Sequence, residues 1–201
     1  DVSRVKVTPL EIGGGFGGKI PIYLEPIVAT LSKKSRRPVK AIMERSNVFQ
    51  ASGPAPGGTI TVKMGTDKNG KLIAAETSIK LEAGGFPGAA VGAAVQCIFA
   101  PYDIPNTRID GYDIVVNKPK SAAYRAPGSP QAAFATETVV NELAELHGMD
   151  RVEFRQVNAS KEGTRRADGV VFPVIGNEEV LDAAKASDHW NSELGEPMKG
   201  R

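Results

Sequence analysis

Two hydrophobic patterns in the first part of the chain predict different elements. Residues 5–12, VKVTPLEI, alternate and are rich in β-branched side chains, which favours a strand. Apolar side chains then recur at helical spacing over residues 24–34, and Pro38 stops that helix. The apolar segment PVKAIM at residues 38–43 predicts a second strand, so residues 5–43 are expected to form a β-loop-α-β unit.

The middle of the chain alternates with a period of two, as antiparallel strands do. Residues 59–65 and 71–83 flank Asn69-Gly70, a pair that tolerates positive φ, and together they predict a long hairpin. Residues 107–116 predict one more strand. Between these strands lies a run of small residues that lets backbones or a bulky ligand approach closely, and we expect Cys97 within it to pack in the core.

The last third of the chain contains residues that typically start and end helices. We expect a helix between Pro130 and Gly148, with Ser129 as its N-cap and the glycine at the C′ position. A shorter helix over residues 151–157 follows the capping residue Asp150, and a last one opens at Asn177. Strands and helices therefore interleave without strict βα repetition, and the fold class is α+β or mixed α/β with C-terminal helices.

Composition narrows the class of protein without naming a ligand. The 201 residues are 41% apolar and 24% charged, which suits a globular protein of one sizeable domain or two small ones. A net charge of +2 is too small to indicate nucleic acid or an anionic membrane as the partner. Because no apolar run approaches the ~18–20 residues of a bilayer span, a cytoplasmic protein is expected. The chain starts without Met and ends in LGEPMKGR, so residues 1–201 are expected to be one partial domain, truncated at both ends.

The segment GGGFGGKI, residues 13–20, matches two phosphate-binding patterns. It fits G-x-G-x-x-G, with Glu44 where a ribose-binding acid would stand, and it fits G-x-x-x-x-G-K, although Ile20 replaces the hydroxyl that binds Mg²⁺. Both patterns need a helix directly after the loop, where Pro26 would cost about 3 kcal/mol. We therefore expect an extended loop that binds a polar or anionic ligand through its backbone N–H groups, with a plain solvent turn as the alternative.

A second unusual segment, SAAYRAPGSPQ, covers residues 121–131. Arg125 stands among small residues, where its planar guanidinium can donate to a phosphate, a carboxylate or an oxo group. The alternative is a capping or interface arginine. Two donor-rich loops in one small chain suggest that both contact a single large ligand.

The two loops carry a family resemblance. GGGFGGK, followed about a hundred residues later by AYRAPGSPQAAFATETVVNELAELHGMDRVEFRQVNAS, resembles the molybdenum-cofactor-binding subunit of the xanthine dehydrogenase and aldehyde oxidase family. The resemblance implies a molybdopterin-binding domain in which both loops pack against the cofactor. The cofactor-binding residues that it implies are Gly15, Phe16, Gly17, Tyr124, Arg125 and Gln131.

The resemblance also implies a reaction: oxidation of an electron-poor carbon with water as the oxygen source. The cofactor is molybdenum-molybdopterin, in a dinucleotide form, with the metal held by the pterin sulfurs and not by protein ligands. Iron–sulfur clusters and FAD on partner domains or subunits take the electrons, and the remainder of the molybdenum subunit is a further partner. The catalytic glutamate of the family is expected beyond Arg201, so no catalytic residue is assigned within the chain.

Departures from the family pattern bear on the substrate. Purine-oxidising members carry a glutamate at the position of Ile20 and an aromatic residue at that of Pro127, and copper-containing carbon monoxide dehydrogenases carry a cysteine at that of Ala126. We expect Ile20 and Pro127 to form an apolar pocket wall that suits an aldehyde, an N-heteroaromatic ring or an acyl thioester. A nucleotide-binding domain that uses GGGFGGK as a phosphate loop, and a non-catalytic assembly module, are the competing hypotheses.

Overall fold

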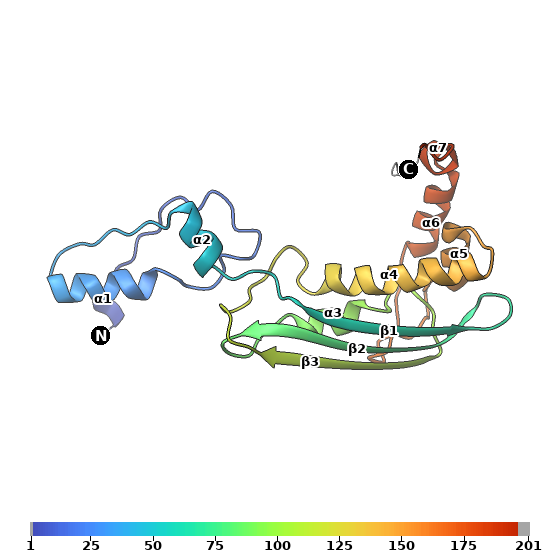
Figure 1. The fold of residues 1–201 in the computed structure, drawn as a ribbon, viewed down its shortest axis with the longest axis horizontal. Helices are drawn as coiled ribbons and strands as arrows, with labels where there is room; N and C mark the ends of the chain where they lie inside the picture. Colours follow the sequence, from blue (N-terminus) through green and yellow to red (C-terminus); the bar gives the residue numbers. More distant parts are fainter. Residues whose placement is uncertain (1, 197–201) are drawn as a thin grey trace. The chain divides into compact units, whose positions relative to one another are not determined.

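The computed structural model describes residues 2–196 (Figure 1). They fall into two compact units. The first unit comprises the chain up to Gly58 together with residues 80–91 and 113–127, and the second comprises residues 59–79, 92–112 and those from 128 onward. The long strands of the molecule therefore contribute residues to both units.

A three-stranded sheet provides the framework, with strand order β1-β2-β3. The strands are β1 (Gly58–Thr66), β2 (Leu72–Gly84) and β3 (Asn106–Val115), as the sequence predicted. The turn from β1 to β2 is closed by Asp67, whose carboxylate accepts from the N–H groups of Asn69 (2.8 Å) and Lys71 (2.9 Å). Gly70 takes the positive φ of 80° that the turn needs. The predicted hairpin is confirmed.

The connection from β2 to β3 contains a helix that the sequence did not predict, α3 (Val91–Cys97). β3 runs in the same direction as β2, since Asn106 bonds the carbonyl of Ile73 at one end and Val116 bonds that of Gly84 at the other (Figure 1). α3 is thus the crossover that a parallel pair requires. Cys97 at its end is exposed, so the expectation that it packs in the core was wrong.

Helix α4 (Ser129–Leu146) supplies much of the core of the second unit. It buries one stripe, Ala132, Thr136, Val140 and Ala144. The Thr136 hydroxyl donates to the carbonyl of Ile98 (2.9 Å), which follows α3. The N-cap is Gly128 and not Ser129, which is the first helical residue: the φ of 82° at the cap position is one that glycine tolerates and serine does not.

Helix α5 (Arg151–Asn158) packs against α4 and begins at the predicted cap, Asp150, whose carboxylate accepts from the Val152 N–H (2.8 Å). Fully buried Asn158 accepts from the Leu72 N–H (2.7 Å) and donates to the Gly70 carbonyl (2.9 Å), so it fixes α5 to the β1–β2 turn. Helices α6 (Asn177–Ala186) and α7 (Asp188–Asn191) follow, and α6 opens at the residue that the sequence predicted.

The first unit contains the short helix η1 (Val2–Arg4), α1 (Glu25–Ser35) and α2 (Arg45–Ala51). α1 matches the predicted helix, but residues 5–12 and 38–43 are irregular, so the β-loop-α-β unit expected over residues 5–43 is wrong. A strand needs backbone partners, and Pro9 also removes one donor from the first segment. The apolar side chains of both segments are largely exposed, so alternation there does not mark a buried face.

Candidate functional site

The glycine loop, residues 13–19, has a backbone that few residues other than glycine can adopt. Gly13, Gly14 and Gly17 have φ values of 72°, 136° and 97°. Phe16 has a φ of 50°, a left-handed conformation that costs a non-glycine residue about 1–2 kcal/mol. The loop turns on itself through the Gly18 N–H, which donates to the Gly15 carbonyl (2.8 Å). This is the extended, helix-free loop that the sequence predicted.

The glycine loop is joined to the arginine loop, residues 121–127, within the first unit. The backbone N–H of Arg125 donates to the carbonyl of Phe16 (2.9 Å). Ala126, directly after the arginine, is also left-handed, with a φ of 57°. Strained backbone on both sides of one hydrogen bond indicates a fixed junction, because such conformations persist only where surrounding contacts impose them.

A close approach of backbones explains why Gly17 has no side chain. A Cβ atom at this position would lie 2.7 Å from the carbonyl oxygen of Ala123 and 2.9 Å from its Cβ. Gly53 makes a similar approach, since a Cβ there would lie 2.5 Å from that of Ala122. The Ala122 N–H also donates to the Pro54 carbonyl (2.8 Å). Residues 52–54 are thus a third segment of the junction. Sequence reasoning read them only as part of a loop, although a Gly-Pro pair is a turn signal.

The side chains of the two loops face outward. Phe16 is 72% exposed, Tyr124 57% and Ile20 77%. Within residues 2–196 the Arg125 guanidinium makes no hydrogen bond or ion pair, and the N–H groups of residues 13–17 donate to no protein acceptor. The first unit therefore offers backbone donors, one cation and aromatic surface to a ligand.

The structure brings together the predicted site residues that belong to the first unit. Gly15, Phe16 and Gly17 meet Arg125 through the contacts above, and Tyr124 precedes the arginine in the same loop. Ile20 and the half-buried Pro127 belong to the same unit. Gln131 belongs to the second unit, where it is the third residue of α4.

Three features fail to support the phosphate-loop hypothesis. The Lys19 ammonium donates to the carbonyl of Ile12 (3.0 Å), so it folds back onto its own loop. α1 begins only at Glu25 and does not follow the glycine loop directly. Its free N–H groups are therefore not in position to bind a phosphate held by that loop. Glu44, which occupies the position of a ribose-binding acid in the pattern, instead caps α2 in a capping box with Asn47.

The described residues do not assemble a metal site of their own. They contain no group of three or more His, Cys, Asp or Glu side chains that could hold a metal ion. Among the same residues, no helix is both long enough and apolar enough to cross a membrane.

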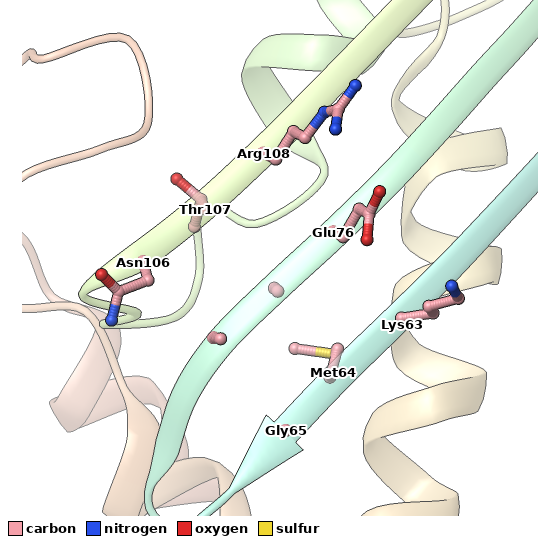
Figure 2. Close-up of a pocket in the computed structure, with 9 residues that line it drawn as sticks. Lys63, Met64, Gly65, Glu76, Asn106, Thr107 and Arg108 are labelled. Carbon is pink, nitrogen blue, oxygen red and sulfur yellow. The ribbon is translucent and has the colours of Figure 1, made fainter.

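A depression of about 390 Å³ lies on the sheet of the second unit. Figure 2 shows the residues that line it. Lys63, Glu76 and Arg108 come from β1, β2 and β3 and alternate in sign across the strands. Opposite charges on neighbouring strands commonly stabilise an exposed sheet face. Among the described residues that line the depression there is no predicted site residue, and we assign no chemistry to it.

The chain is similar to known proteins over most of its length. The molybdopterin cofactor-binding domain family matches residues 1–159. The chain is 32% identical over 188 residues to the nicotinate dehydrogenase large molybdopterin subunit of Eubacterium barkeri, covering 91% of this chain and 44% of that protein. It is 32% identical over 158 residues to the aldehyde oxidoreductase molybdenum-binding subunit of Escherichia coli K12, covering 78% of this chain and 21% of that one. The chain thus spans less than half the length of these relatives.

Solved structures share the fold. The aldehyde oxidoreductase from Desulfovibrio gigas superposes with a TM-score of 0.79 at 30% identity, covering 86% of this chain and 19% of that one. Quinoline 2-oxidoreductase from Pseudomonas putida 86 superposes with a TM-score of 0.80 at 22% identity, covering 87% of this chain and 24% of that one. At this identity the similarity shows a shared fold only. The family match covers most of the chain and includes both loops of the junction. The chain belongs to the molybdopterin cofactor-binding domain family of the xanthine dehydrogenase and aldehyde oxidoreductase enzymes.

Proposed function

We propose that this chain contributes the glycine loop and the arginine loop to the molybdopterin site of a molybdenum hydroxylase. The observation that carries the proposal is the junction itself: the Arg125 N–H donates to the Phe16 carbonyl, and Gly17 lies against Ala123. Two segments about a hundred residues apart, each similar to a cofactor-binding motif of the family, are thereby in direct contact. The enzyme oxidises an aldehyde, an N-heteroaromatic ring or a related carbon centre with water as the oxygen source.

The residues present fit a molybdopterin. Its polar ring edges and phosphate need donors, and the loops present unpaired N–H groups at residues 13–17 and the Arg125 guanidinium within the described chain. At Gly15 and Gly17 the space of a side chain is taken by Lys19 and Ala123, so the proposed contact of these glycines with the ligand is through their backbone. When bound, the molybdenum group supplies the oxidation chemistry. The roles of this chain are to bind and orient the group, with Tyr124 next to the arginine and Gln131 as a further polar contact.

The substrate side of the proposal rests on Ile20 and Pro127. Ile20 is exposed directly after the glycine loop, and neither the Ile20 nor the Pro127 side chain can form a hydrogen bond with a purine. An apolar wall suits a flat heteroaromatic ring or an aldehyde. The names of two relatives, a nicotinate dehydrogenase and an aldehyde oxidoreductase, support the same substrate classes.

The surface of the first unit exposes apolar side chains that indicate a protein partner. Many large apolar side chains there are exposed, among them Val5, Leu10, Ile12, Ile22, Ile42 and Phe49. A surface of this kind marks a contact with other protein. We propose that the remainder of the molybdenum subunit covers it, and that iron–sulfur and FAD domains or subunits receive the electrons.

Isotope labelling tests the reaction class. The protein purified from its own host is incubated with nicotinate or benzaldehyde, a dye as electron acceptor, and oxygen-18 water. The proposal predicts that the oxidised product of one of them carries oxygen from the water. Product labelled only from molecular oxygen, or turnover of ATP in place of both substrates, would contradict it.

A further inference from the structure

Tyr23 connects two backbone segments that are far apart in the sequence. Its hydroxyl donates to the carbonyl of Gly18 (2.8 Å) at the end of the glycine loop. The same oxygen accepts from the N–H of Gly53 (2.7 Å). The side chain is half-buried, and all three residues belong to the first unit. One hydroxyl group thus satisfies a carbonyl of one loop and an N–H of another.

The second of these bonds extends to the arginine loop. Gly53 approaches Ala122 so closely that it has no room for a Cβ, and the neighbouring Pro54 accepts the Ala122 N–H (2.8 Å). The Tyr23 hydroxyl therefore lies at one end of a continuous path that runs through residues 53–54 to the arginine loop. The direct bond between Arg125 and Phe16 closes this path at its other end.

The position of Tyr23 is itself fixed. Its backbone N–H donates to the Glu25 carboxylate (2.9 Å) in the first turn of α1. Hydrogen bonds from the backbone of Glu25 itself and from that of Tyr23 hold the pKa of the Glu25 carboxyl below its usual range. The bond from the Tyr23 N–H connects the backbone of Tyr23 to the start of α1. A phenylalanine in place of Tyr23 would lack the hydroxyl that makes the two hydrogen bonds.

We propose that Tyr23 is a positioning residue whose hydroxyl holds the glycine loop in the conformation that receives the cofactor. This role rests on the proposed function of the two loops. Loss of the hydroxyl leaves the Gly18 carbonyl and the Gly53 N–H without their protein partner. A polar group that is shielded from water and has no hydrogen-bond partner is costly, so the glycine loop would shift toward conformations in which these groups bond to water. A ligand that binds only one loop conformation is then held more weakly, in proportion to the lost population.

The test compares Tyr23→Phe with Tyr102→Phe in the protein produced in its own host. Tyr102 is the matched control, because its hydroxyl bonds the Glu137 carboxylate (2.7 Å) in the second unit, outside the loops. Amide hydrogen exchange of Gly53 and of residues 13–19 reports the loop directly, with no need for a cofactor. Molybdenum release during dialysis reports cofactor retention, and the melting temperature reports overall stability.

Tyr23→Phe is expected to speed both Gly53 exchange and molybdenum release at least tenfold, while Tyr102→Phe lowers the melting temperature without changing either rate. Unchanged exchange at Gly53 would overturn the hydrogen-bonding role, and unchanged molybdenum release with faster exchange would overturn the positioning role. If Tyr23→Phe fails to fold, wild-type exchange decides: an unprotected Gly53 amide refutes the proposal. A wild-type protein without molybdenum would refute the proposed function, and this role of Tyr23 with it, whatever the exchange result.

Discussion

Replacement of Gly17 by alanine is the perturbation that bears most directly on the loop junction. The new Cβ would lie 2.7 Å from the Ala123 carbonyl oxygen and 2.9 Å from the carbonyl carbon, which are backbone atoms that cannot rotate away. It would also stand on a backbone with a φ of 97°, which disfavours any L side chain. One methyl group thus introduces both a steric clash and backbone strain, and the two loops must separate to relieve them.

The magnitude follows from these two contributions. A left-handed conformation costs a residue with a Cβ about 1–2 kcal/mol. Insertion of a methyl group into a packed contact costs about 1–3 kcal/mol. The site is at the surface and the loops can move apart, so we take about 3 kcal/mol as the free energy by which the substitution disfavours contact between the two loops. This corresponds to a roughly 100-fold loss of apparent cofactor affinity.

The assay is the molybdenum content of the purified protein before and after dialysis, with Gly13→Ala as the matched control. Gly13 also has a positive φ, 72°, but a Cβ there would meet no heavy atom within 4 Å. Gly13→Ala therefore carries the strain without the clash, and its cost of about 1–2 kcal/mol predicts a roughly 5- to 30-fold loss in retention. Equal losses in the two variants would refute the contact with Ala123 as the reason for glycine.

Three further predictions concern other residues. Arg125→Ala is expected to lower the molybdenum content of the protein. The free energy of unfolding in urea should change by less than about 0.5 kcal/mol, because the guanidinium has no partner within residues 2–196. Full molybdenum content in this variant would contradict the cofactor-binding role of Arg125. Burial, with the Glu137 carboxylate, raises the pKa of Tyr102, so its hydroxyl contributes stability that is present below about pH 10 and is lost as the pH rises further. Between pH 9 and 11 the melting temperature of the wild type should therefore fall more than that of Tyr102→Phe, and parallel curves would show that the hydroxyl is not coupled to folding. Asp150→Ala removes the cap of α5 and should cost about 1 kcal/mol in urea unfolding with molybdenum content unchanged; a stability equal to wild type would contradict the capping role.

Local signals were enough to predict most elements of the second unit. The β1–β2 hairpin follows from Asn69-Gly70 between alternating segments, and α5 follows from Asp150, because these features act within a few residues. α3 was missed because its residues, VGAAVQC, lack a capping signal and resemble a small-residue loop. The N-cap of α4 was misplaced by one residue, since the sequence does not reveal the positive φ of Gly128.

The first unit depends on contacts that no local pattern encodes. Residues 5–12 and 38–43 have the composition of strands, but strand formation needs a partner, and both segments are irregular. The two loops were recognised from their motifs, whereas their contact through Gly17 and Ala123 is visible only in three dimensions. Tyr23 gave no signal at all, because a tyrosine five residues beyond a glycine is ordinary until its hydroxyl is placed. The assignment of individual residues to the cofactor stays a prediction.

Metal and pterin analysis of the protein purified from its own host tests the central claim most directly. Molybdenum is measured by mass spectrometry, and the pterin by its fluorescence after oxidation. The account predicts molybdenum and pterin at close to one each per chain, in a protein whose Gly17→Ala variant loses most of both. A protein that carries neither, and that holds a nucleotide instead, would contradict the account and make Lys19 the residue to test.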